Sequence, residues 1–254
     1  MLFTSFLLSA LLVGCNDSEK SETEKTSKFQ KFDKTDINKA AEQVNPVPSP
    51  LKMSEMLQKA KIEAKVSKLV QVTKNPELKD DKESIAVQCG VLIADVVLMV
   101  NTASKEDLTI RLVSLKAGFN GLGVKGGAPE TIDEMISTLK DDNFNRESLL
   151  EEMDDLSQAM VAELEYEAGT WVAPLIQAGM WLEGANLISA ALVMENKVTE
   201  ADPFIKRPGI LKYFLRYVKK KTSETAPKSV IADLESTLNQ LLTIANKKEL
   251  SKDD

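Results

Sequence analysis

The amino-acid sequence predicts an all-α fold, a single multi-helix bundle. Apolar residues recur at the spacing of one helix face in several segments, for example at Ile231, Leu234 and Leu238. Residue pairs that begin helices, such as serine followed by proline, precede some of these segments. No segment alternates apolar and polar residues as a half-buried strand does, and none carries the turn signal of a β-hairpin.

The chain begins with the apolar run MLFTSFLLSALLVGC, which is too short to span a bilayer as a helix but suits a secretory signal. Leu12-Val13-Gly14-Cys15 resembles the lipobox of bacterial lipoproteins. This resemblance implies that residues 1–14 are a lipoprotein signal peptide and that Cys15 is lipidated. No Lys or Arg precedes the run, which departs from ordinary signals, and a start site assigned too late would explain it. The alternative is a buried N-terminal helix with a core cysteine.

Residues 15–48 are rich in Lys, Glu, Ser, Thr and Asp, so they offer little apolar surface to offset the entropy of ordering. We expect them to form the lipidated cysteine and a flexible tether. Residues 49–250 are expected to form one all-helical domain of roughly 200 residues, which is enough for a single core. Residues 251–254 are expected to be a polar tail.

The helical domain is expected to open with Ser49 as the N-cap and Pro50 at the first helical position. The expected helices span, in chain order, residues 51–66, 80–103, 104–117, 130–139, 146–168, 171–194, 209–221 and 228–246. Gly118 and Gly121 are expected to end the third helix. Residues 121–126 match the G-x-G-x-x-G pattern of dinucleotide-binding loops. A helix precedes this stretch where that motif needs a strand, so we favour an ordinary loop.

Composition excludes several kinds of site. The chain has no histidine, which excludes His-based catalytic triads and His-ligated zinc or iron. Its net charge of −7 argues against nucleic-acid binding. Cys89, the second of two cysteines, has apolar neighbours and is expected to be a packed small hydrophobe. We predict no metal site and no cofactor.

Two of the expected helices are apolar almost all round, yet each carries one acid, Asp95 or Glu183. An unpaired buried carboxylate is costly, so each acid needs a partner or water. Gln88 lies seven positions before Asp95 and Gln177 six before Glu183, so each pair is expected to share a face roughly. We expect both acids near the centre of the bundle, where small residues let the helices approach closely. Their expected partners are Gln88, Gln177, Asn101 or Asn186, with Arg111 as the cation.

Three interpretations of these acids remain open. They belong to a structural hydrogen-bond network, or they line a pocket that binds a ligand, or they form an acid and base pair. Glu163, Glu165 and Glu167 form a separate run of acids, which we interpret as a solvated helix face.

The segments PSPLKMSEML, GVLIADVVL and GMWLEGANL occur in this order, and they resemble motifs of an uncharacterised family of all-helical bacterial envelope lipoproteins. The resemblance covers about residues 48–193. It places Asp95, Trp181, Glu183 and Gly184 on the family's motif positions. Met180 stands where a second glycine is common, and Leu98 where an aromatic residue usually follows the aspartate. The resemblance implies the fold and the location of the protein, and it leaves the activity open.

The segment PGILKYFLRYVKKK is predicted to form an amphipathic helix with one apolar face and one basic face. Its basic residues would contact anionic lipid headgroups, and they are Lys212, Arg216, Lys219 and Lys220. The alternative is that the apolar face belongs to the core and the basic side chains are solvated.

These observations predict a lipid-anchored accessory protein of the bacterial cell envelope that faces the periplasm and acts by binding an unknown protein or small molecule. One alternative is a small-ligand-binding bundle with a central polar site at Asp95 and Glu183, and another is a carboxylate-based enzyme. Trp181 is included in the candidate site. A closed core around the acids, with an exposed apolar patch elsewhere, would favour an interaction protein. A cavity at the acids would favour a ligand-binding protein.

Overall fold

Helices make up most of the part of the chain that the computed structural model describes, which is residues 47–70, 77–220 and 228–254. This part contains ten α-helices, one short 3-10 helix and no strand, which confirms the predicted all-α class. None of these helices is both long enough and apolar enough to cross a membrane. The predicted signal peptide, Cys15 and the tether up to residue 46 lie outside the described residues.

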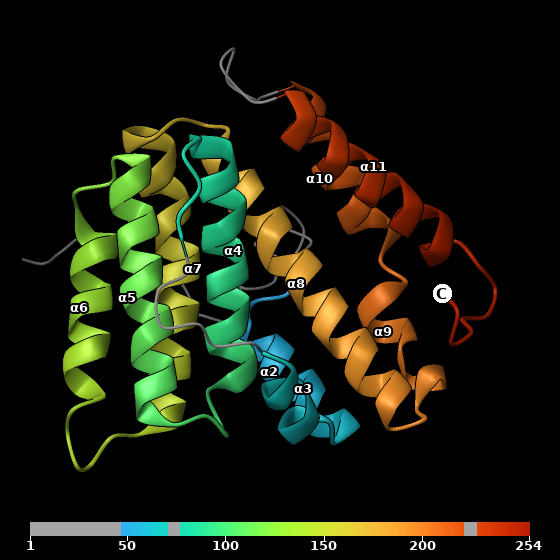
Figure 1. Ribbon diagram of the computed structural model, residues 1–254, viewed down its shortest axis with the longest axis horizontal. Coiled ribbons are helices and arrows are strands. Elements are labelled where there is room, and N and C mark those ends of the chain that lie inside the picture. The colour runs from blue at the N-terminus through green and yellow to red at the C-terminus, as the bar shows by residue number, and fades with distance from the viewer. Residues whose placement is uncertain (1–46, 71–76, 221–227) are drawn as a thin grey trace, which may run out of the picture.

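Two helices form the centre of the molecule, α4 (Lys82–Met99) and α8 (Val172–Met194), and they pack closely against each other (Figure 1). A Cβ atom added to Gly90 would lie 2.0 Å from the carbonyl oxygen of Ile176, and one added to Gly179 would lie 2.1 Å from that of Val87. Only glycine fits at these two positions, because each faces the backbone of the other helix. The expected close approach is therefore present.

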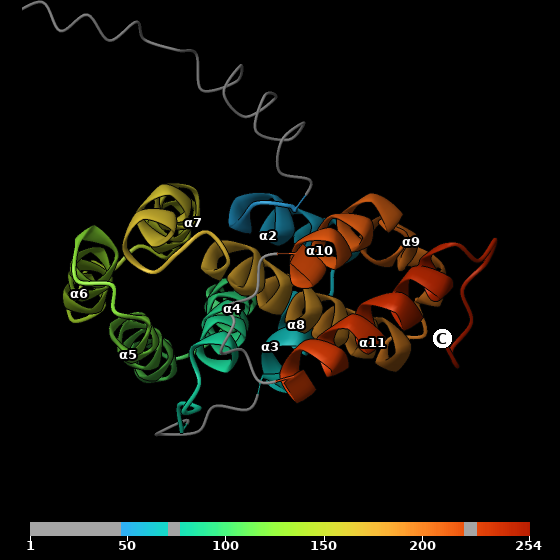
Figure 2. The same ribbon diagram turned by 90° about the horizontal axis from the view of Figure 1, so that it is seen from above.

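Three helices lie on one side of α4: α5 (Lys105–Leu122) and α7 (Arg146–Glu167) pack on it, and α6 (Gly127–Thr138) packs on α5 and α7. Figure 2 shows them at one end of the molecule, with α4 and α8 in the middle. Cys89 of α4 is fully buried against α5, where a Cβ on Gly118 would lie 2.4 Å from its Sγ. Burial raises the pKa of the Cys89 thiol to about 12, so this residue is the packed small hydrophobe that we expected.

The first expected helix, over residues 51–66, is two helices in the structure, α2 (Pro50–Ala60) and α3 (Glu63–Leu69). Lys61 separates them with a left-handed backbone conformation, φ 55°. The helix start is as predicted, because Ser49 is the N-cap and its side chain accepts a hydrogen bond from the Lys52 backbone N–H. Buried Asp154 of α7 accepts a second hydrogen bond from the Leu51 N–H, at 3.2 Å.

The expectation that Gly118 and Gly121 end a helix is wrong, because both lie inside α5. This helix ends at Gly123, which has the left-handed φ of 94° that favours glycine. Gly118 has a packing role instead, since it makes room for Cys89.

Carboxylates of α7 bind one backbone amide of the glycine-rich loop after α5 and one in the first turn of α6. The Ala128 N–H donates to Glu163 Oε2 at 3.1 Å, and the Lys125 N–H donates to Glu167 Oε2 at 2.8 Å. These amides are the groups that would bind phosphate in a dinucleotide loop, and here the chain's own acids occupy them. The interpretation of this run of acids as a solvated face holds for Glu165 and Glu167, which are exposed, although Glu167 also binds the Lys125 amide; it is wrong for Glu163, which is half-buried.

The C-terminal part contains η1 (Val198–Glu200), α9 (Asp202–Ile205), α10 (Pro208–Lys220) and α11 (Lys228–Ala245). The apolar face of α10 is in the core, as the alternative interpretation of this helix stated; its buried residues are Ile210, Leu211, Phe214, Leu215 and Val218. Lys212 and Arg216 are exposed. The side chains of Lys219 and Lys220 lie outside the described part of the structure. The two shortest helices, η1 and α9, are too short to show a period in the sequence.

Candidate ligand-binding site

Asp95 and Arg111 form a buried ion pair between α4 and α5. Arg111 Nε lies 3.1 Å from Asp95 Oδ2, and the two side chains are only 6% and 4% exposed. Burial raises the pKa of Asp95 to about 7; the Arg111 guanidinium opposes this rise and the Glu183 carboxylate adds to it. Arg111 is therefore the cation beside Asp95, as the sequence suggested.

Glu183 of α8 is only half-buried, which explains why an apolar helix carries this acid. Its side chain is hydrogen-bonded to Asn186, one turn further along α8. Burial raises the pKa of Glu183, while the Asn186 hydrogen bond and the Arg111 charge lower it. Partial solvation, one amide and one nearby cation thus keep the acid at this position.

Asp95, Arg111 and Glu183 line a cavity of about 370 Å³, which we call the polar pocket. Its other lining residues are Leu69, Gln88, Val91, Leu92, Asn186 and Leu187. The structure thus brings together both acids of the two central helices at a cavity.

Gln88 lies on the Asp95 face of α4, but its hydrogen bonds hold the segment before the helix. Its Nε2 donates to the Glu77 carbonyl at 3.0 Å, and its Oε1 accepts from the Lys79 N–H at 3.3 Å. Gln88 is therefore part of the pocket wall, and these two hydrogen bonds join it to backbone groups rather than to the acids.

Gln177 and Trp181 lie outside the polar pocket, on the side of α8 that faces α10. Gln177 Oε1 accepts a hydrogen bond from the Tyr213 hydroxyl at 3.1 Å, and Trp181 packs on Phe214 with ring centroids 6.4 Å apart. Our expectation that Gln177 and Glu183 share a face is wrong. Six residues make about 1.7 helical turns, so the two side chains point roughly 120° apart.

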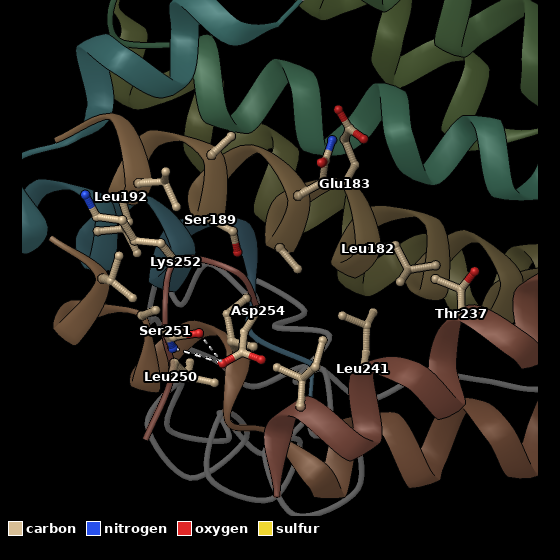
Figure 3. Close-up of a pocket in the computed structure, with 18 of the residues that line it drawn as sticks. Leu182, Glu183, Ser189, Leu192, Thr237, Leu241, Leu250, Ser251, Lys252 and Asp254 are labelled. Atoms are coloured by element: carbon tan, nitrogen blue, oxygen red, sulfur yellow. Dashed lines mark hydrogen bonds between the residues drawn. The ribbon is translucent and has the colours of Figure 1, made fainter. Parts of the chain in front are cut away.

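A second cavity of about 580 Å³ lies between α8, α11 and the C-terminal residues, and we call it the apolar groove (Figure 3). Its apolar lining includes Leu182, Leu192, Leu241, Ile244 and Leu250. Glu183, Asn186 and Val91 line the apolar groove as well as the polar pocket. Figure 3 shows Glu183 at the edge of the groove that faces α4. The two cavities therefore adjoin at Glu183.

The C-terminal residues fold back along the groove instead of extending away from the domain. Asp254 accepts a hydrogen bond from the Ser251 N–H at 2.9 Å and forms an ion pair with Lys247 (Figure 3 shows the Ser251 bond). The hydrogen bond from Lys247 is the largest of the causes that lower the pKa of Asp254 to about 2. Residues 251–254 are polar, as expected, and they also form one wall of the groove.

No pattern in the sequence indicates the apolar groove. The sequence of α8 is apolar almost all round, which predicts a place at the centre of the bundle and marks no face that borders a cavity. In the structure α11 packs mainly on α10, which leaves Leu241 and Ile244 half-buried beside α8. The distance between two helices is a tertiary property that neither helix's own pattern contains.

Comparison of the chain with protein-family models, with curated proteins and with solved structures finds no match. Within the described residues, no group of three or more His, Cys, Asp or Glu side chains is placed to hold a metal ion. The two cavities are therefore the features of the structure that bear on function.

Proposed function

We propose that the protein is a lipid-anchored accessory protein of the bacterial cell envelope, facing the periplasm, which binds a small amphiphilic molecule. The apolar groove would hold the body of the ligand and the polar pocket its head group. One observation carries this proposal: Glu183 and Asn186 line both cavities, so one ligand can contact apolar and charged groups together.

The size and lining of the two cavities support binding of a small molecule. Volumes of about 580 and 370 Å³ lie within the range of roughly 300–1,000 Å³ that small-molecule sites occupy. Such sites combine an apolar lining with a few charged or polar groups that orient the ligand. A cavity at Asp95 and Glu183 is also the feature that distinguishes a ligand-binding bundle from a protein with a closed core.

The location in the envelope rests on the sequence. The lipobox tetrad ending at Cys15 and the resemblance to a family of helical envelope lipoproteins support a lipid anchor. The exposed Lys212 and Arg216 would add attraction to anionic headgroups once the lipid holds the domain near the membrane. Because the apolar face of α10 is buried, this contact would be electrostatic and sensitive to salt.

Binding of Nile red, a neutral dye that fluoresces in apolar sites, tests the groove. Ser189 is half-buried on α8 and lies in the groove, so Ser189→Trp should fill it and abolish the dye signal (Figure 3). The matched control is Ser236→Trp, because Ser236 is exposed on α11 and lines neither cavity. Equal dye binding by both variants would refute the groove as the site.

Native mass spectrometry of the protein purified from its own envelope addresses the natural ligand. We expect wild type to retain a small molecule that Ser189→Trp lacks. A retained mass that is equally present in Ser189→Trp would show that the molecule binds elsewhere.

A further inference from the structure

We infer that the ligand carries a single cationic head group, a primary amine, which Glu183 binds where the apolar groove meets the polar pocket. This inference rests on the proposed function, because it concerns the head group of the same ligand. It follows from the charges that line the two cavities and from the hydrogen-bonding groups beside Glu183.

Among the described residues, the lining of the polar pocket carries two carboxylates, Asp95 and Glu183, and one cation, Arg111. Arg111 lies 3.1 Å from Asp95, and both are buried, so when Asp95 is ionised these two charges offset each other. The third charged residue in the described lining of this pocket is Glu183, which is half-buried and faces both cavities. A ligand cation at this point would complete the charge balance.

The opposite end of the apolar groove does not alter this balance. Lys252 and Asp254 also line the groove, and their charges are opposite. Lys252 is exposed, so solvent screens its charge. Figure 3 places Lys252 near Leu192 and away from Glu183.

The groups at Glu183 suit an ammonium ion. The Glu183 carboxylate accepts hydrogen bonds, and the amide of Asn186, whose hydrogen bond lowers the pKa of Glu183, lies beside it. The side-chain oxygen of Asn186 is a second acceptor, so a primary amine could donate to both residues. An anionic head group would meet repulsion from Glu183, and it would have to separate Arg111 from Asp95 to gain a cation.

Three probes with the same alkyl chain test the inference by isothermal titration calorimetry, each below its micelle concentration: decylamine, decanol and decanoate. Wild type should bind decylamine roughly tenfold more tightly than decanol, because a hydrogen bond to a charged group contributes about that difference in affinity. It should bind decanoate most weakly of the three. Glu183→Gln keeps the shape of the side chain and removes its charge, so decylamine should fall to the affinity of decanol. Glu151→Gln, which removes an exposed acid of α7, should leave the order unchanged.

The probes separate failure of this inference from failure of the proposed function. Equal affinity of wild type for decylamine and decanol would overturn the amine head group and leave the apolar groove as a binding site. An unchanged preference for decylamine in Glu183→Gln would also overturn it. Absence of binding for all three probes would overturn the proposed function itself. The comparison on wild type needs no variant, so it holds even if Glu183→Gln is unstable.

Discussion

Asp95 and Arg111 lie on adjacent helices, α4 and α5, and their side chains meet with Nε 3.1 Å from Oδ2 and almost no contact with solvent. A pair in this position has lost the hydration of both charges, so each charge depends on the other. The pair also forms one wall of the polar pocket. The protonation state of the Asp95–Arg111 pair therefore affects the stability of the fold and the charge that a ligand meets.

Loss of the cation should be severe at alkaline pH. Arg111→Met would leave Asp95 buried without its cation, and at about pH 8 the free energy of unfolding should fall by roughly 3–5 kcal/mol. The control is Lys116→Met on the same helix, because Lys116 pairs with Asp133 in a largely exposed ion pair. That variant should lose less than about 1 kcal/mol. Urea unfolding of both variants measures the difference, and similar losses would show that the buried pair contributes no more than an exposed one.

The pH dependence of stability should reveal Asp95. Its pKa in the folded state is raised to about 7 from an ordinary value of 3.8, so the folded state holds the proton more tightly than the unfolded state does. The stability that this proton confers is complete below the ordinary pKa and is lost as the pH rises toward 7. Arg111 and Glu183 are the charged groups that face Asp95 across the pocket.

Asp95→Asn should flatten this part of the profile, because asparagine does not titrate. Urea unfolding at a series of pH values between about 4 and 8 provides the measurement. A slope that persists unchanged in Asp95→Asn would assign the dependence to another group.

The contact between α4 and α8 should not tolerate a methyl group at either glycine. Alanine is normally the better helix former by about 1 kcal/mol, yet Gly90→Ala and Gly179→Ala would place a Cβ about 2 Å from a backbone oxygen. We expect each change to destabilise the fold by roughly 1–3 kcal/mol through overpacking. Gly209→Ala is the control, because a Cβ there meets nothing within 4 Å. Thermal melts in which all three variants match wild type would contradict the close approach.

Features that depend on local sequence were predicted well. The N-cap Ser49 was identified from the proline that follows it, and its side chain accepts a hydrogen bond from the Lys52 N–H in the structure. The seven-residue spacing of Gln88 and Asp95 placed both on the same pocket, because seven residues make nearly two turns.

Features that depend on packing were predicted poorly. The sequence did not show that Gly118 faces Cys89 inside a helix, so a packing glycine was interpreted as a helix end. Glu163 and Glu167 bind amides at the start of α6 and in the loop before it, 35 and 42 residues away in the chain, and no local pattern indicates such a contact. The apolar groove was missed for the same reason, since it exists because α11 packs mainly on α10.

The lipid anchor makes a separate prediction, at a residue that lies outside the described part of the structure. Cys15→Ser should abolish incorporation of a fatty-acid analogue in growing cells, because the lipid is expected on that thiol. Cys89→Ser is the matched control and should keep the label, since Cys89 is fully buried. Equal labelling of wild type and Cys15→Ser would refute the anchor.

Glu183 should affect the protonation of Asp95 more than the stability of the fold. It is half-buried and hydrogen-bonded to Asn186, so Glu183→Gln should change the free energy of unfolding by less than about 1 kcal/mol. Glu183→Ala also loses the hydrogen bond, and we expect it to cost roughly 1 kcal/mol more.

The charge of Glu183 raises the pKa of Asp95, so its removal should lower that pKa. In Glu183→Gln, the pH at which stability stops falling should therefore move below the value of about 7 expected for wild type. Glu151→Gln removes an exposed charge on α7 and should leave this pH where it is. Because the two acids share the polar pocket, a double-mutant cycle with Asp95→Asn should show that their effects do not add. Additive effects and an unshifted profile would mean that the two carboxylates do not face each other across the pocket.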